Sequence, residues 1–178
     1  TTTASITPKA ITVSGITVAD KVYDGTVARA IGDITDGIDW TAVGVISGDT
    51  ISASITGAYA DKNVAYSGST VIDKTVTLTE TYSGDTSNYT ITAQGTTTAK
   101  ITRKSVSVSG ITANDKIYDG TDTATVVVSG ATIANLIAGD DLVVSATGVF
   151  AESSAGAGDA ADAGSKTVTL TSTYTGAD

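Results

Sequence analysis

The 178-residue chain contains no cysteine, no histidine and no methionine. Without cysteine, no disulfide can hold the fold together. Without histidine, the chain lacks the commonest general base and the commonest transition-metal ligand. The sequence also has no nucleophile elbow, phosphate-binding loop or zinc-ligand spacing. We therefore expect a protein that is not an enzyme and that has no resident cofactor.

Positive charge is scarce as well. Lys and Arg together number 10 against 19 Asp and Glu, which gives a net charge of −9. Nucleic acids and anionic membrane surfaces both attract clusters of basic side chains, which this composition disfavours. The chain also has no apolar run of the roughly 18 residues that a membrane helix needs. We expect neither a nucleic-acid partner nor insertion into a membrane.

Aromatic residues make up 5% of the chain and there is a single proline. A core must therefore be built mostly from Val, Ile, Leu and Ala. Threonine and serine are abundant, and there are 19 glycines. Branched side chains suit a half-buried pleated surface, and glycine with Asp and Asn supplies turns. This composition predicts an all-β protein.

Apolar and polar residues alternate with period two in several segments, as in strands with one buried face. Ile51 and Ile55 lie on one face of the first such segment, and Val76 and Leu78 on one face of another. We expect two tandem small β-sandwich (Ig-like) modules. The alternative is a pair of β-grasp-like modules, each with one short helix. The candidates for that helix are residues 36–46 and 131–137.

A long internal repeat organises the chain. Residues 9–26, KAITVSGITVADKVYDGT, recur as residues 104–121, KSVSVSGITANDKIYDGT, with 12 of 18 positions identical. The segment KTVTLT at residues 74–79 recurs at residues 166–171. Modules repeated in this way contact mainly their neighbours. Neighbouring repeats of the same chain are therefore the first partners that we expect.

The repeat also predicts the module boundaries. Residues 1–9, TTTASITPK, match residues 96–104, TTTAKITRK. We therefore expect the tail of a preceding repeat, a first repeat, and a second repeat that lacks its last strand. In that order they occupy residues 1–8, 9–102 and 103–178.

The most regular part of the repeat is the segment DKVYDGT at residues 20–26, copied as DKIYDGT at residues 115–121. Its glycine permits a positive φ, its second Asp can accept backbone N–H groups in a turn, and its Tyr offers a ring to the core. Its Lys can pair with a carboxylate. We interpret the segment as a structural turn-and-core element, with a carbohydrate or ion site as the alternative. The candidate residues are Asp20, Lys21, Tyr23, Asp24, Gly25, Asp115, Lys116, Tyr118, Asp119 and Gly120.

These two segments resemble the signature of the YDG-type tandem repeat found in large filamentous-haemagglutinin-like bacterial surface adhesins. The NYTI and AKIT segments at residues 88–91 and 99–102 resemble the closing strands of that repeat. The resemblance spans essentially the whole chain. It implies an extracellular protein on the bacterial cell surface that is made of many such copies, and it supplies no ligand.

Two candidate sites outside the repeat motif are weaker. Asp33, Asp36 and Asp39 are spaced by three residues, and calcium would need six to eight oxygens converging there. Trp40 is the one aromatic that stands out as a binding residue. We expect a non-catalytic spacer that extends a distal binding region from the cell. The alternative is that the repeats themselves bind a glycan or a host or cell-surface protein.

Overall fold

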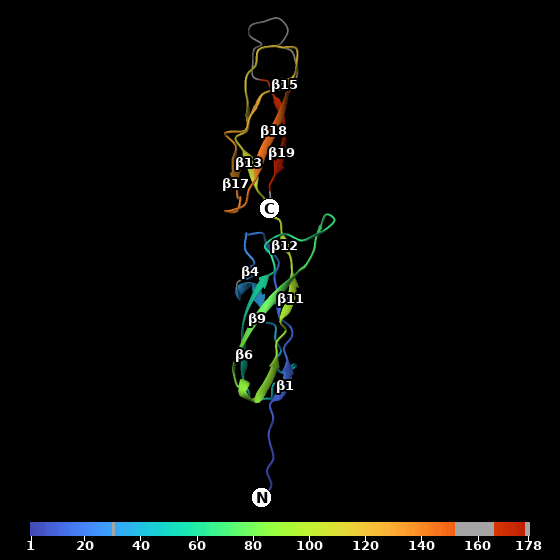
Figure 1. Ribbon diagram of the computed structural model, residues 1–178, viewed down its shortest axis with the longest axis vertical. Helices are drawn as coiled ribbons and strands as arrows, with labels where there is room; N and C mark the ends of the chain where they lie inside the picture. The colour runs from blue at the N-terminus through green and yellow to red at the C-terminus, as the bar shows by residue number, and fades with distance from the viewer. Residues whose placement is uncertain (30, 152–165, 177–178) are drawn as a thin grey trace. The chain divides into compact units, whose positions relative to one another are not determined.

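The computed structural model describes residues 1–29, 31–151 and 166–176 (Figure 1). The chain divides into two compact units, Thr1–Lys104 and Ser105–Asp178, which we call the first and second modules. The described residues contain strands and two short 3-10 turns, η1 (Ile31–Asp33) and η2 (Thr86–Asn88), but no α-helix. The all-β prediction is confirmed. The short helix of the β-grasp alternative is not found in the described part of the chain.

The first module is built on a four-stranded antiparallel sheet (Figure 1). Its longest pair is β6 (Ile51–Tyr59) with β9 (Lys74–Gly84), in register from Ile51 opposite Gly84 to Tyr59 opposite Val76. The short strand β4 (Ala28–Arg29) pairs with β6, and β11 (Thr96–Ala99) pairs with β9. The alternation in sequence explains the two faces, because the threonines of β9 point to solvent while Val76 and Leu78 are buried.

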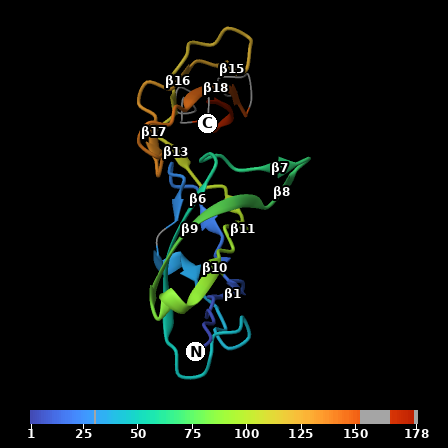
Figure 2. The same cartoon turned by 60° about the horizontal axis from the view of Figure 1, so that its bottom comes forward.

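Short two-stranded ladders cover the buried face of this sheet. The strand β1 (Lys9–Thr12) runs parallel to β10 (Tyr89–Thr92), and β3 (Lys21–Val22) runs parallel to β12 (Ile101–Thr102). The third ladder, β2 (Thr17–Val18) with β5 (Ile34–Thr35), is antiparallel. Figure 2 shows β1 and β10 together beside the sheet. The core between the two layers consists of Val13, Ile16, Val18, Ile55, Tyr59, Val76, Leu78, Ala99 and Ile101.

Two strands of the first module lie apart from these layers. The strands β7 (Tyr66–Ser67) and β8 (Thr70–Val71) form a hairpin that extends away from β6 and β9 (Figure 2). At the base of this arm, Lys74 donates to the Asp61 carboxylate at 2.5 Å and to the Asn63 carbonyl at 2.7 Å. These bonds hold the loop that leads into the arm.

The second module repeats the central part of this plan. The strands β15 (Thr123–Ala124), β18 (Val143–Phe150) and β19 (Val168–Thr175) form an antiparallel sheet that corresponds to β4, β6 and β9. The pair β14 (Thr112–Ala113) with β16 (Val126–Val127) corresponds to β2 with β5. A further ladder joins β13 (Ser107–Ser109) to β17 (Thr132–Ala134).

Both modules contain a close crossing of two backbones that admits only glycine. A Cβ on Gly15 would lie 2.6 Å from the carbonyl oxygen of Gly37, and a Cβ on Gly110 would lie 2.4 Å from that of Gly130. Gly15 and Gly110 also have positive φ, of +98° and +79°. The crossing therefore requires glycine both for space and for conformation. Nowhere in the described residues is there a helix long and apolar enough to cross a bilayer.

Candidate functional site

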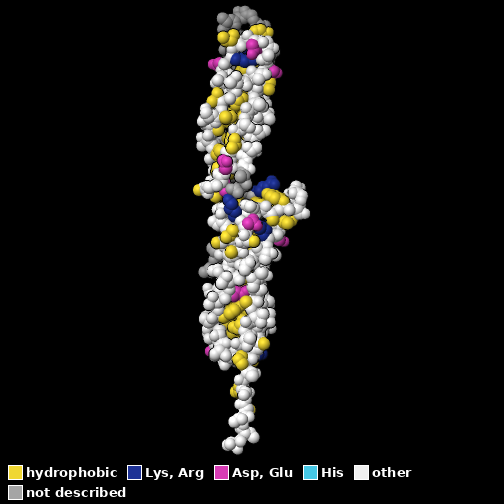
Figure 3. Space-filling model, viewed as in Figure 1, with side chains coloured by type: hydrophobic (Ala, Val, Ile, Leu, Met, Phe, Trp, Pro, Cys, Tyr) yellow, Lys and Arg dark blue, Asp and Glu magenta, His cyan; other side chains and the backbone are white. Residues whose placement is uncertain are grey.

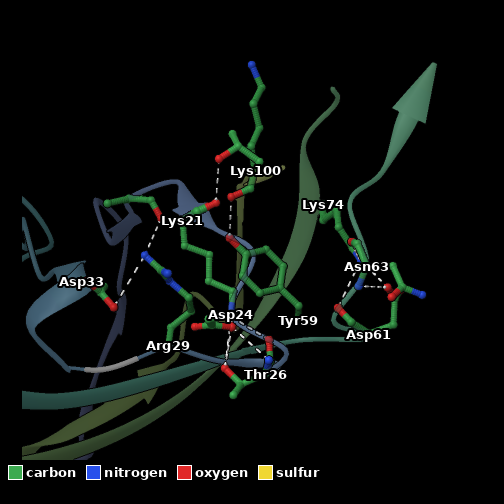
Figure 4. Close-up of polar contacts among 12 residues, drawn as sticks. Lys21, Asp24, Thr26, Arg29, Asp33, Tyr59, Asp61, Asn63, Lys74 and Lys100 are labelled. Atoms are coloured by element: carbon green, nitrogen blue, oxygen red, sulfur yellow. Dashed lines mark hydrogen bonds and ion pairs between the residues drawn. The ribbon is translucent and has the colours of Figure 1, made fainter. Parts of the chain in front are cut away.

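The YDG segment of the first module forms a compact network of polar contacts among Lys21, Asp24 and Thr26, which we call the knot (Figure 4). The ammonium group of Lys21 donates to Asp24 Oδ1 at 2.7 Å, to the Thr26 carbonyl at 2.6 Å and to Thr26 Oγ1 at 3.2 Å. These bonds use all three of its donors. Lys21 is 8% exposed, so its charge is held inside the module and neutralised there.

The turn that holds this lysine is built by Asp24 and Gly25. Asp24 Oδ1 accepts the Thr26 backbone N–H and the Thr26 hydroxyl, both at 2.9 Å, while Gly25 has a φ of +77°. This is the Asp-anchored turn that the motif predicts. Partial burial works to raise the pKa of the Asp24 carboxyl, but the bonds from Lys21 and Thr26 together outweigh it and leave the pKa below its ordinary value.

The knot is attached to the last strand of the module. The backbone N–H of Lys21 donates to the Lys100 carbonyl at 2.9 Å, and that of Tyr23 donates to the Thr102 carbonyl at 2.8 Å. In return, the backbone N–H of Lys100 donates to Asp20 Oδ1 at 2.7 Å. The motif therefore pairs with residues 100–102, which we call the closing strand because they complete the module.

An aromatic ring ties the lysine to the main sheet. The Lys21 ammonium lies 5.7 Å from the centre of the Tyr59 ring, within the range of a cation–π contact. Tyr59 lies at the end of β6 and donates its hydroxyl to the Lys100 carbonyl at 3.2 Å. Figure 4 shows Lys21, Tyr59 and Lys100 converging from separate segments. The knot thus joins the turn, the sheet and the closing strand.

The second module contains the same knot. Lys116 donates to Asp119 Oδ1 at 2.8 Å and to the carbonyl and hydroxyl of Thr121 at 2.7 and 2.9 Å. Gly120 has a φ of +78°, and Lys116 lies 5.8 Å from the centre of the Phe150 ring. The hydrogen bond from Lys116, with those from Thr121, lowers the pKa of Asp119 to about 2.

The two copies differ at the remaining motif residues. Tyr23 packs against the core of the first module, whereas Tyr118 is 65% exposed. The prediction that Tyr118 supplies a ring to the core is therefore wrong. Asp115 is exposed as well, whereas Asp20 accepts a bond from the closing strand. The physical reason is contact with the segment after β9: its residues 100–102 hold Asp20 and Tyr23, whereas among the described residues no such backbone bonds reach Asp115 or Tyr118.

The residues of the two weaker candidates make contacts within the first module. Asp36 and Asp39 accept backbone N–H groups of their own loop, from Ile38 and Ala42, while Asp33 lies 3.7 Å from Arg29. No group of three acidic residues suited to a metal ion occurs within the described ranges. Trp40 is partly buried and meets the Tyr82 ring edge-on, with centroids 6.3 Å apart, so it contributes to packing.

Sequence reasoning missed several partners of the motif. Thr26 and Thr121 lie inside the duplicated segment, so their repetition was an available signal. Tyr59 and Phe150 align at the ends of matching strands, and this alignment was a weaker signal. No local pattern points to Lys100, because it lies about 80 residues from the turn that its backbone contacts. That contact is visible only in the fold.

The YDG domain family matches residues 7–99 and again residues 102–178. Comparison with curated proteins and with solved structures gave no match. The two matches coincide with the two knots, since each contains one complete Lys–Asp–Thr arrangement. The chain therefore belongs to the YDG domain family and carries two YDG domains in tandem.

Proposed function

We propose that these YDG domains are non-catalytic spacers in the stalk of a bacterial cell-surface adhesin, where they extend a distal binding region away from the cell. The observation that carries the proposal is the pairing of the terminal strands in the first module. Both β1, at its beginning, and β12, at its end, are held in parallel ladders. A stalk has to resist force applied through its two ends, and these are the strands that would take the load.

Parallel ladders suit this load. Tension along a terminal strand loads the hydrogen bonds of its ladder in shear, so that they bear the force together. A hairpin pulled from its open end is unzipped instead, and its hydrogen bonds break one at a time. Buried side chains on both terminal strands add resistance, since Ile11 is 3% exposed and Ile101 is 0% exposed. Asp20 adds a further bond to this ladder, because its carboxylate accepts the backbone N–H of Lys100 at 2.7 Å.

The motif side chains also favour a structural role over a binding role. Each knot satisfies the donors of its lysine internally and uses Oδ1 of its aspartate to do so, which favours a structural use of these groups over binding of a sugar or an ion. The acidic net charge of −9 favours a dispersed, soluble surface. We place the protein outside the cell on the resemblance to surface adhesins, and we expect neighbouring repeats to be its main partners.

Single-molecule pulling tests this proposal. The full chain is held at its two termini, and the force that opens the first module is compared between the wild type and Ile101→Ala. We expect wild-type unfolding at a force well above that of an unzipping hairpin, and a clear drop in the variant. A wild-type module that opens at hairpin-like force would overturn the stalk role.

A binding screen distinguishes the spacer role from the alternative, in which the repeats themselves bind a glycan or a cell-surface protein. The full chain is applied to a glycan array and to intact cells, with the Trp40→Ala variant as a control for the most distinctive aromatic. We expect no saturable binding. Saturable binding to a defined glycan or cell-surface protein would favour repeats that engage the ligand themselves.

A further inference from the structure

A chemically reactive dipeptide occurs three times in the sequence. Asp is followed by Gly at residues 24–25, 36–37 and 119–120, and Asn is nowhere followed by Gly. An aspartate in this position is prone to cyclise, because glycine has no side chain to keep the carboxyl group away from its nitrogen. Two of the three pairs lie in the knots, whereas the third lies in the loop after β5.

The three aspartates have the same local turn. In each, Oδ1 accepts the backbone N–H group of the residue two positions further along the chain. The donors are Thr26, Ile38 and Thr121, at 2.9, 3.1 and 2.9 Å. All three are also open to water, since Asp36 is exposed and the side chains of Asp24 and Asp119 are 50% and 56% exposed. Neither the turn nor burial therefore distinguishes them.

The knots add donors to two of the three carboxylates. Asp24 Oδ1 also accepts the Lys21 ammonium at 2.7 Å and the Thr26 hydroxyl at 2.9 Å. Asp119 Oδ1 accepts the corresponding groups of the second module at 2.8 and 2.9 Å. Asp36 has neither an ion pair nor a side-chain donor among the described residues. The three pairs are therefore a matched set in which one lacks the knot.

The shortage of positive charge makes such a partner uncommon in this protein. The chain has 10 Lys and Arg against 19 Asp and Glu, and basic side chains, in dark blue, cover little of the visible surface (Figure 3). Each knot places one of these cations directly on the aspartate of an Asp–Gly pair.

Cyclisation requires the carboxyl group to turn toward the next residue and to lose an oxygen. The glycine nitrogen bonds to Cγ of the aspartate, and the N–H proton leaves with the hydroxyl group of the protonated carboxyl as one water. The five-membered ring then takes up one water. Opening at Cγ restores aspartate, and opening at the main-chain carbonyl produces isoaspartate, in which the main chain runs through Cβ and Cγ.

The bonds of the knot oppose both requirements. They hold Oδ1 in place, so the carboxyl group is not free to turn toward the glycine nitrogen. They also keep the group ionised, because the bonds from Lys116 and Thr121 lower the pKa of Asp119 to about 2, and the pKa of Asp24 is lowered as well.

We propose that Asp36 is a site of spontaneous modification to isoaspartate, and that the knots protect Asp24 and Asp119 from the same reaction. The lysine of each knot thus has a second role besides stability, which is to preserve the covalent structure of the motif. This role holds for any function of the domain, since it depends on the chemistry of the turn alone.

The position of Asp36 makes its modification disruptive. Isoaspartate adds one carbon to the main chain directly before Gly37, which lies in the close backbone crossing of the first module. A Cβ on Gly37 would lie 2.5 Å from the carbonyl oxygen of Gly15, so the crossing has no spare room. On one side Thr35 is held in the ladder of β5 with β2, and on the other Ile38 packs against the core. A longer main chain between them must displace one or the other.

Ageing of the full chain at physiological temperature and neutral pH tests the proposal. Isoaspartate is located by mass spectrometry with electron-based fragmentation, in the folded chain and in the chain unfolded in guanidinium chloride. We expect similar rates at the three pairs when the chain is unfolded. In the folded chain we expect Asp36 to react at least tenfold faster than Asp24 and Asp119. Equal rates at the three sites of the folded chain, or a slower rate at Asp36, would overturn the proposal.

Lys116→Met tests the protection directly. The variant removes the cation from the more exposed knot and leaves the bonds from Thr121, while Asp24 of the same chain is an internal control. We expect isoaspartate to form several-fold faster at Asp119 and at an unchanged rate at Asp24. An unchanged rate at Asp119 would contradict a protective role of the lysine.

Asp36→Glu tests the consequence for the first module. Glutamate keeps the charge, but its longer side chain would have to form a six-membered ring, which closes far more slowly. We expect the urea midpoint of the Trp40 transition to fall in the aged wild type in proportion to its isoaspartate, and to stay constant in the aged variant. A wild type that accumulates isoaspartate at residue 36 and keeps its midpoint would contradict the disruption of the crossing.

Discussion

Lys21 shows how a single charged residue can be both buried and structural. It lies at 8% exposure with a carboxylate, a carbonyl and a hydroxyl around its ammonium group and an aromatic ring nearby. Burying an ammonium group costs free energy unless its donors are satisfied. Here they are satisfied within six residues of chain, so the knot forms from local sequence alone.

Replacing this lysine should therefore destabilise the first module. Lys21→Met keeps the length of the side chain but leaves Thr26 and Asp24 without their donor. We expect the free energy of unfolding to fall by about 1–3 kcal/mol. Urea unfolding followed by the fluorescence of Trp40 reports on this module, which contains the only tryptophan of the chain.

The matched control is Lys116→Met. Lys116 occupies the same place in the second module, and its side chain is 22% exposed against 6% for that of Lys21. The Trp40 transition should not move in this variant. Equal shifts from the two substitutions would mean that the two modules unfold as one unit.

The carboxylate of the second knot predicts a pH dependence. Hydrogen bonds from Lys116 and Thr121 lower the pKa of Asp119 from an ordinary 3.8 to about 2. Because the folded pKa is the lower one, this group stabilises the fold fully above about pH 4, and the contribution is lost as the pH falls toward 2. NMR titration of the Asp119 carboxyl should give the low value in the wild type and a higher value in Lys116→Met, in which only the bonds from Thr121 remain. The same pKa in both proteins would show that Lys116 is not the cause.

At the residue scale, the sequence predicts those backbone conformations and hydrogen bonds that depend only on residues close together in the chain. The positive φ of Gly25 and the bond from the Thr26 N–H to Asp24 follow from the turn chemistry of the motif. The exposure of Tyr118 does not follow from it, because burial of this ring depends on a strand far along the chain. A nearly identical local sequence, DKVYDGT and DKIYDGT, therefore has a different environment in each module.

At the scale of elements, long alternating strands were predictable and short parallel pairs were not. The faces of β6 and β9 follow from period-two alternation that runs for most of their length. The ladders of β1 with β10 and of β3 with β12 join segments about 80 residues apart. Strands of two to four residues contain too little pattern to identify their partners.

The closing strand can be tested by a pair of substitutions in almost identical sequence. Ile101→Ala removes a side chain that is 0% exposed, and we expect a loss of about 2–5 kcal/mol from the first module. Ile6→Ala changes the matching residue of residues 1–9, which is 102% exposed, and should leave the Trp40 transition of the dilute protein unchanged. A comparable loss from Ile6→Ala would mean that residues 1–8 also pack on their own module.

At the scale of the whole molecule, the two YDG domains differ in stability despite their common sequence. The buried hydrophobic residues belong almost entirely to the first module, and Ala124 is the one described residue of that class in the second. Burial of apolar area is the main source of folding free energy. The second module should therefore unfold first.

Urea titration followed by two signals measures this difference. The Trp40 signal reports on the first module alone, whereas far-ultraviolet circular dichroism reports on strands in both. We expect the dichroism to change at lower urea than the fluorescence, as two separate transitions. Coincident transitions would show that the modules unfold as one unit.

Because residues 1–9 and 96–104 are nearly identical, either segment could compete for the place of β12 beside β3 while the chain is being synthesised. The first module has one such segment just ahead of it and must wait for another that emerges about 80 residues later. The distance between the places of β1 and β12 in the fold resolves this ambiguity. In the first module β1 and β12 lie toward opposite ends (Figure 1), so a segment tethered two residues ahead of Lys9 is too short to arrive at the place of β12. Repeats built in this way can copy their closing sequence many times and still direct each copy to the module behind it, which keeps misassembly between near-identical neighbours low.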